Sequence, residues 1–234
     1  MPSSGSSGRE GDARLTAHLE TYLGRWPPRA AVDVVGHEAR LGPAWDGASV
    51  VAVAVASPAG TLVSVVPGRQ SGPAASRLAA TPVLTDDFRR ELAALAGVGE
   101  AQASPWLPFR WTVEPADLPD AGQWVGPEHP ALPDWLRLFA GPVLVALDPV
   151  TGRYLAGVAA KPHTRWGREL AVGTDEAARG RGLARRLVAQ KARAVLADGA
   201  VPLYVHHPDN VASARVADAA GLADTGWRIL YVWG

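Results

Sequence analysis

The chain has 234 residues, enough for one large domain or two small ones. Its 23 lysines and arginines balance 23 aspartates and glutamates, so no overall positive charge favours nucleic acid or an anionic membrane as a partner. The absence of cysteine excludes disulfides, thiolate nucleophiles and cysteine zinc sites, and no apolar run is long enough to cross a membrane. A cytoplasmic protein is therefore the expectation.

The first part of the chain predicts a tail and then an N-terminal α/β region over residues 13–100. Residues 1–12 are rich in serine and glycine, which favours a flexible tail. Leucines at helical spacing predict a helix over residues 13–23, and residues 31–35 favour a strand.

A β-hairpin is expected next in this region. Residues 50–56 and 61–66 are apolar and flank Ser57-Pro58-Ala59-Gly60, a sequence typical of turns. A helix should follow, with Thr85 as its N-cap and Gly97 as its stop.

The middle of the chain, residues 101–133, is rich in proline and tryptophan. Prolines at this density prevent long helices, so we expect one strand near residues 109–114 and loops elsewhere. Residues 133–139 could form a helical turn or two. The tryptophans could cover the hydrophobic core or form the walls of a ligand pocket.

The last ninety or so residues predict a regular order of strands and helices. The expected strands are a hairpin over residues 142–147 and 153–160 and single strands over 168–172, 203–206 and 227–233. The expected helices are one over 183–198 with Gly199 as its stop, and one that Asn210 or Pro208-Asp209 opens and that runs through Ala220.

A glycine-rich turn separates the third of these strands from the long helix. Its sequence is Arg179-Gly180-Arg181-Gly182-Leu183-Ala184. Glycine lets a ligand approach the backbone closely, and the free N–H groups of the first helical turn favour an anion such as a pyrophosphate. Neither a third glycine in G-x-G-x-x-G spacing nor a P-loop lysine accompanies it.

A second motif lies downstream, where Asn210 is followed by Ser213 and then by Gly221-Leu222. The two motifs together resemble those of the GCN5-related N-acetyltransferase (GNAT) superfamily, in particular its bacterial members, over roughly residues 105–234. The resemblance implies an α/β (α+β) fold with a mixed, mostly antiparallel sheet flanked by helices, in a domain over residues 101–234.

The resemblance implies an N-acetyltransferase that transfers an acetyl group from acetyl-CoA to an amine of a small molecule or peptide. A non-catalytic acyl-CoA-binding or regulatory module is the alternative. No metal site is expected, and the protein would be a monomer or homodimer. The residues implied in acetyl-CoA binding are Ala171, Val172, Thr174, Arg179, Gly180, Arg181, Gly182, Leu183, Ala184, Arg185, Asn210 and Ser213.

The residues that often perform catalysis in this superfamily are missing from their usual positions. Ala217 stands where a tyrosine acid is common, and Trp166 stands where a glutamate base is common. Among nearby titratable residues, Glu169 and His163 are the preferred candidates for the base, ahead of the pair His206-His207. A solvated or purely structural role is the alternative for each of them.

The strand at residues 227–233 is apolar on both faces and would leave an open edge. We therefore expect the hairpin at residues 50–66 to lie beside it, with the N-terminal α/β half packed against the acetyltransferase half; a homodimer is the rival arrangement. Since that hairpin resembles the one at residues 142–160, residues 13–100 could be a degenerate GNAT-like copy.

Overall fold

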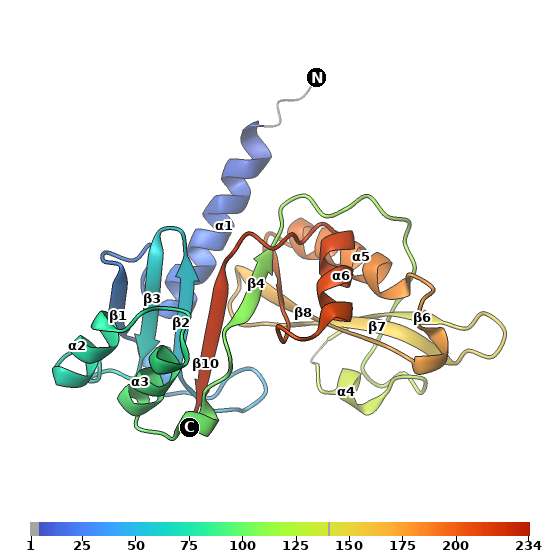
Figure 1. Cartoon of the computed structure of the whole chain (residues 1–234). Coiled ribbons are helices and arrows are strands. Elements are labelled where there is room, and N and C mark those ends of the chain that lie inside the picture. The colour runs from blue at the N-terminus through green and yellow to red at the C-terminus, as the bar shows by residue number, and fades with distance from the viewer. Residues whose placement is uncertain (1–4, 140) are drawn as a thin grey trace. The chain divides into compact units, whose positions relative to one another are not determined.

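The computed structural model of the chain describes residues 5–139 and 141–234, with side chains from residue 13 onward (Figure 1). The chain forms two compact units that are interleaved in sequence. Unit 1 comprises Met1–Arg14, Arg110–Val205 and Asn210–Ala223, and unit 2 comprises Leu15–Phe109, His206–Asp209 and Asp224–Gly234. The end of the chain thus belongs to the same unit as most of its N-terminal half, whereas the sequence placed one boundary near residue 100.

The sheet of unit 2 has the strand order β1-β3-β2-β10-β4. β1 and β3 are parallel, and the other neighbours are antiparallel. The strands are β1 (Val32–Gly36), β2 (Val50–Ser57), β3 (Gly60–Val65), β10 (Arg228–Trp233) and β4 (Leu107–Trp111), of which β4 crosses from unit 2 into unit 1.

The last strand, β10, lies beside the β2–β3 hairpin as the sequence predicted. Its residues pair antiparallel with β2 from Arg228↔Ala56 to Trp233↔Val50. Leu230 and Val232 are fully buried on the face that packs against the helices α2 and α3. The pairing satisfies the backbone groups of one edge of β10.

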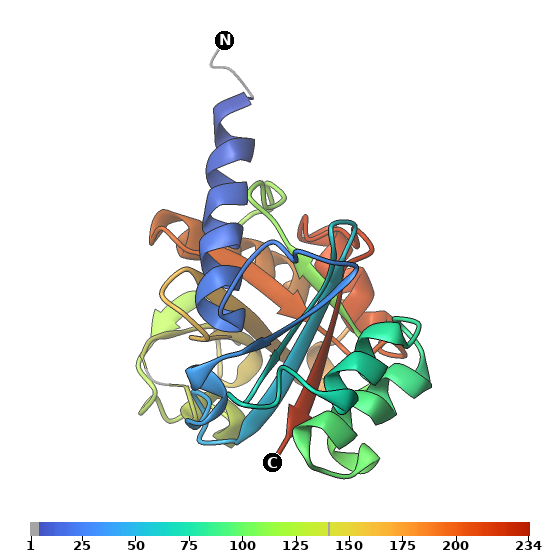
Figure 2. The same cartoon turned by 90° about the vertical axis from the view of Figure 1, so that its left-hand side faces the viewer.

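Three helices flank the unit 2 sheet: α1 (Gly5–Leu23), α2 (Pro73–Ala80) and α3 (Asp86–Ala96). Figure 2 shows α1 on one side of the strands and α2 and α3 on the other. The predicted caps of α3 are confirmed, because the Thr85 hydroxyl accepts the Phe88 N–H and Gly97 adopts a φ of 78°. The sequence did not predict α2.

Helix α1 begins at Gly5, before its predicted start at Ala13, which corrects the predicted flexible tail over residues 5–12. Extending a helix that is already anchored requires less free energy than starting one. The anchor is the buried stripe of Leu15, Leu19 and Leu23. Residues 1–4 of the predicted tail lie outside the described residues.

The sheet of unit 1 has the strand order β9-β8-β7-β6-β5. All neighbours are antiparallel except β8 and β9, which are parallel. The strands are β5 (Gln123–Val125), β6 (Val143–Leu147), β7 (Tyr154–Lys161), β8 (Gly167–Thr174) and β9 (Val201–Val205).

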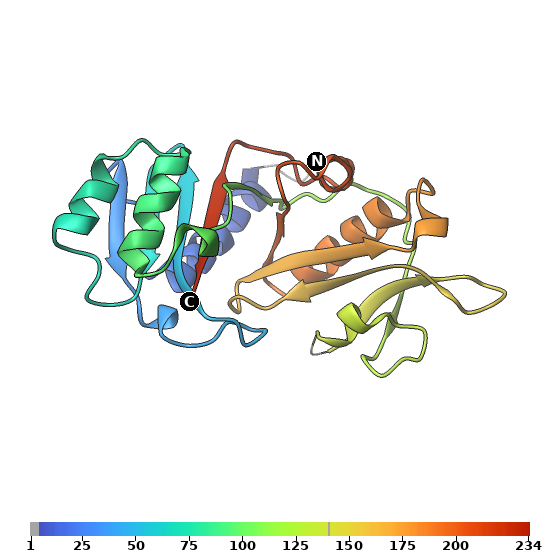
Figure 3. The same ribbon diagram turned by 60° about the horizontal axis from the view of Figure 1, so that its bottom comes forward.

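Helix α5 (Leu183–Ala197) covers one face of the unit 1 sheet, where Leu187, Val188 and Ala192 are fully buried. Figure 3 shows α5 on one side of β7 and β8 and the short helix α4 (Asp134–Arg137) on the other. Helix α6 (Val211–Ala219) packs beside α5. The remaining helical segments are the 3₁₀ turns Glu38–Arg40, Glu100–Gln102 and Glu176–Ala178.

The predicted fold class is confirmed: the structure is α/β, with mostly antiparallel sheets flanked by helices. Strand β5 was not predicted, because three residues are too few to show a periodic pattern. Strand β4 begins two residues before the strand predicted over residues 109–114. Among the described residues, no helix is long and apolar enough to cross a membrane.

Candidate functional site

The parallel strands β8 and β9 separate partway along their length. They pair at Gly167↔Val201, Arg168↔Pro202 and Glu169↔Leu203, and the pairing ends there. On its other edge β8 stays paired with β7 as far as Thr174↔Ala156. The second half of β8 therefore presents backbone groups toward a gap, where a ligand with amide groups can bind them.

The glycine-rich turn lies between the end of β8 and the start of α5. Gly180 and Gly182 have φ angles of 77° and 72°, a conformation that side chains disfavour. Gly182 is the N-cap of α5, and no side chain caps the helix there. The first N–H groups of α5 are thus left for a ligand, at the positive end of the helix dipole.

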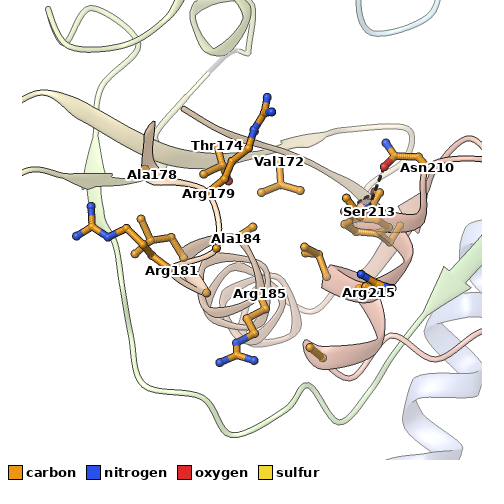
Figure 4. Close-up of a pocket in the computed structure, with 18 residues that line it drawn as sticks. Val172, Thr174, Ala178, Arg179, Arg181, Ala184, Arg185, Asn210, Ser213 and Arg215 are labelled. Atoms are coloured by element: carbon orange, nitrogen blue, oxygen red, sulfur yellow. Dashed lines mark hydrogen bonds between the residues drawn. The ribbon is translucent and has the colours of Figure 1, made fainter. Parts of the chain in front are cut away.

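The gap and the turn open into one pocket with a volume of about 810 Å³ (Figure 4). Its walls come from the end of β8, the turn, the first residues of α5, one residue of β9 and one side of α6. The lining residues are Val172, Gly173, Thr174, Ala178, Arg179, Gly180, Arg181, Gly182, Leu183, Ala184, Arg185, Tyr204, Asn210, Ala212, Ser213, Arg215, Val216 and Ala219.

The pocket brings together every residue that the resemblance implied in acetyl-CoA binding except one. The exception is Ala171, which does not line it. Leu170 and Val172 pack with the core beneath α5, and alternate residues of a strand point to opposite faces. The Ala171 side chain therefore points to the opposite face of β8.

Asn210 is the N-cap of α6. Its Oδ1 accepts the Ser213 N–H at 3.0 Å. This is the structural role that the sequence left open for Asn210. Because the bond uses only the amide oxygen, the side-chain NH₂ group can still donate to a ligand in the pocket.

Tyr204 of β9 is a pocket residue that the sequence reasoning missed. Its hydroxyl lies 2.9 Å from the Ser213 hydroxyl, and its ring is almost fully buried. Burial raises the pKa of Tyr204, and the hydrogen bond with Ser213 and the charge of Arg110 offset this only in part. The hydroxyl therefore stays protonated at neutral pH. The sequence signal that could have indicated this residue was a tyrosine in the strand that follows α5.

Both predicted base candidates belong to one cluster with Lys161, in which the Glu169 side chain is buried. His163 Nε2 lies 2.8 Å from Glu169 Oε2, and Lys161 Nζ lies 2.5 Å from Glu169 Oε1. Burial alone would raise the pKa of Glu169. The hydrogen bond with His163 and the charges of Lys161 and His163 outweigh that effect and lower the pKa to about 2. Because such a carboxylate only accepts hydrogen bonds, Nε2 of His163 carries the proton.

The cluster and the pocket lie on opposite faces of β8. Glu169 shares its face with Gly173, where an added β-carbon would come within 2.7 Å of the Trp135 ring on α4. Glu169 is also the last β8 residue paired with β9. A group that passes from the pocket through the gap would therefore emerge close to this cluster. Among the described residues, no group of three or more His, Asp or Glu is arranged as a metal site.

Residues 150–225 match a family model described as FR47-like protein, whose family is related to the GNAT superfamily. No curated protein matches the chain significantly. The matched segment includes the glycine-rich turn and the Asn210 motif. Over these residues the chain therefore carries the sequence pattern that its two motifs indicated.

Two solved structures are among those similar to the chain. An acetyltransferase of the GNAT family from Colwellia psychrerythraea is 16% identical, and the match covers 56% of each chain with a TM-score of 0.45. A GCN5-related N-acetyltransferase-like protein from Streptococcus suis is 19% identical, with a TM-score of 0.45 over 64% of this chain and 69% of that one. The chain thus spans little more than half of the first structure.

Proposed function

We propose that the protein is an acetyl-CoA-dependent N-acetyltransferase that acts on an amine of a small molecule or peptide. One observation carries the proposal: the gap between β8 and β9, the uncapped start of α5 and the polar start of α6 open into a single pocket. A pyrophosphate suits the helix start, and a pantetheine arm with two amides suits the gap. The thioester would then lie near the point where β8 and β9 separate.

The reaction proposed is direct transfer. The amine nitrogen attacks the thioester carbonyl carbon, the carbon–sulfur bond breaks, and the sulfur leaves as a thiolate that takes up a proton. The amine gives up one proton to a base or to water. In this scheme the amine approaches from the face of β8 that carries Glu169, opposite the pocket.

The side chains for the proton steps differ from those common in the superfamily. Tyr204 supplies a protonated hydroxyl beside the pocket, next to Ser213, and would donate a hydrogen bond to the leaving sulfur. Glu169 is a weak base, because its pKa is lowered to about 2. We therefore assign Glu169 to orienting His163, whose Nε2–H it accepts, and keep His163 as the candidate to relay the proton of the amine.

The binding half of the proposal is tested at the start of α5. Ala184 lines the pocket, and it lies in a helix, so a substitution there brings no unfavourable φ. Ala184→Glu should weaken acetyl-CoA binding by about 100-fold, because it places a side chain and a negative charge at the anion site. Ala197→Glu, at the exposed other end of the same helix, is the matched control. Equal affinities of both variants in titration calorimetry would contradict the assignment.

The catalytic half is tested with a panel of amines that includes polyamines, amino acids, aminoglycosides and peptides. Acetyl-CoA and each amine are incubated with the protein, and mass spectrometry detects the gain of one acetyl group. Thiol release without an acetylated product would instead indicate hydrolysis.

A non-catalytic acyl-CoA-binding module is the second candidate. Two observations favour it: Glu169, the last β8 residue paired with β9, is already bonded by Lys161 and His163, and Ala217 occupies the usual tyrosine position. Tight binding of acetyl-CoA without turnover across the whole amine panel would support this module over the enzyme.

A further inference from the structure

The pocket is strongly positive in a chain that is neutral overall. Four arginines line it, and none of its lining residues is an aspartate or glutamate. The whole chain carries 23 basic and 23 acidic residues, so this separation is local. A concentration of one charge in a concave site favours a ligand with several opposite charges.

Three of these four arginines have no partner among the described residues. Arg179 lies 3.8 Å from Glu176. Within the described part of the chain, Arg181, Arg185 and Arg215 make no ion pair and no side-chain hydrogen bond. Their cationic groups are available to a ligand.

Two arginines farther along α5 show the contrast. Arg186 donates to the Pro119 and Asp120 carbonyls, and Arg193 donates to the Ala116 and Leu118 carbonyls. These two side chains hold the loop that crosses the helix. Arg186 and Arg193 thus have acceptors, whereas Arg181, Arg185 and Arg215 have none among the residues that the structure describes.

The unpartnered arginines come from three places: Arg181 from the glycine-rich turn, Arg185 from α5 and Arg215 from α6. The Arg185 Nε atom lies 3.1 Å from the position of an added β-carbon on Gly182, so this side chain lies over the glycine-rich turn. Arg215 belongs to α6 and lines the pocket from the other side (Figure 4). When one anionic group of a ligand binds at the turn, Arg215 is available to bind a second anionic group of the same ligand.

We propose that Arg215 makes the pocket selective for donors that carry the 3′-phosphate of coenzyme A in addition to the pyrophosphate. This inference rests on the proposed function. A phosphate monoester carries a charge of about −1.5 to −2 at neutral pH, more than either phosphate of the pyrophosphate bridge. Arginine binds phosphate oxygens with paired N–H donors, so a single residue can provide the discrimination.

The test compares coenzyme A with dephospho-coenzyme A, which differ only by the 3′-phosphate, in titration calorimetry with the full chain. The unmodified protein should bind coenzyme A about fivefold more tightly, the effect expected of a well-placed but solvent-exposed ion pair. Arg215→Met should remove this preference by weakening coenzyme A alone, and Arg215→Lys should retain part of it. Higher salt should reduce the preference.

A matched control removes an exposed arginine elsewhere. Arg90 on α3 of unit 2 has a side chain that is 53% exposed, and Arg90→Met changes the net charge by the same amount. It should leave the preference unchanged. The variants Arg181→Met and Arg185→Met should weaken both nucleotides equally, because they act at the turn.

The outcomes separate this inference from the proposed function. Equal binding of the two nucleotides by the unmodified protein would overturn the inference while leaving acetyl-CoA binding intact. A preference that survives in Arg215→Met would show that Arg215 is not the discriminating residue. If the unmodified protein binds neither nucleotide, the proposed function itself fails.

Discussion

The two units each contain one parallel strand pair, and the two pairs behave differently. In unit 2, β1 and β3 stay paired over five residues, from Val32↔Thr61 to Gly36↔Val65. In unit 1, β8 and β9 pair over three residues and then separate. In both units one strand of the parallel pair leads through a loop to a helix that begins after a glycine with positive φ. In unit 2, β3 leads to α2 after Gly72, and in unit 1, β8 leads to α5 after Gly182.

The comparison shows that a glycine-started helix after a strand does not by itself make the pocket. What differs in unit 1 is the separation of the strands and the arginines around the turn. The backbone groups along the second half of β8 are left for a ligand, whereas those between β1 and β3 are used within the sheet. Whether residues 13–100 derive from a duplicated copy stays a prediction.

The largest expected effect comes from replacing one buried leucine in the core of each unit. Leu187 on α5 and Leu92 on α3 are both fully buried, so replacing either with alanine should lower the free energy of unfolding by about 3 kcal/mol. Only Leu187→Ala should also weaken acetyl-CoA binding, because Leu187 supports the turn at the start of α5. Denaturant titration and calorimetry measure the two effects. Equal binding by both variants would show that this core does not position the turn.

The Glu169 cluster should make the stability of unit 1 depend on pH. The pKa of Glu169 falls from an ordinary value of 4.5 to about 2 on folding, so its stabilising effect is complete above about pH 5 and is lost as the pH falls toward 2. Glu169→Gln should therefore cost about 2 kcal/mol at pH 7 and progressively less below pH 4. Thermal unfolding of the unmodified protein and of Glu169→Gln, at pH 7 and below pH 4, measures this cost. A stability difference between the two proteins that is the same at both pH values would contradict the prediction.

Tyr204→Phe should lower kcat by about tenfold with little change in acetyl-CoA affinity, because the hydroxyl beside the leaving sulfur is removed while the ring stays. Tyr231→Phe, the same change in β10 of unit 2, is the control and should leave kcat unaltered. The measurement uses an acceptor identified from the amine panel. A normal rate in Tyr204→Phe would mean that water protonates the thiolate.

The smallest effects concern two helix caps, one in each unit. Thr85→Ala and Asn210→Ala should each cost about 1 kcal/mol of stability, since each side chain accepts a backbone N–H of the first helical turn. Asn210→Ser should keep the cap but lose the amide donor that we expect to reach pantetheine. A loss of acetyl-CoA affinity in Asn210→Ser, with stability retained, would separate the two roles of Asn210; an unchanged affinity would leave only the cap.

Local signals in the sequence were sufficient for most elements of unit 1 and for the anion-binding half of the pocket. The apolar periods, the glycine stops and the turn at residues 179–184 act over a few neighbouring residues, and so they can be read directly from the sequence. The final strand was also predicted to need a partner, since both of its faces are apolar. The same reasoning predicted that this strand lies beside the hairpin at residues 50–66.

Only the tertiary structure decided the features that depend on how separate strands and helices meet. It paired Glu169 with both His163 and Lys161, which makes the carboxylate a poor base. It placed Tyr204 against Ser213 and brought Arg215 of α6 to the same pocket as the glycine-rich turn. Side-chain burial, pKa and the partners of each arginine depend on these contacts between elements, and no local pattern in the sequence specifies them.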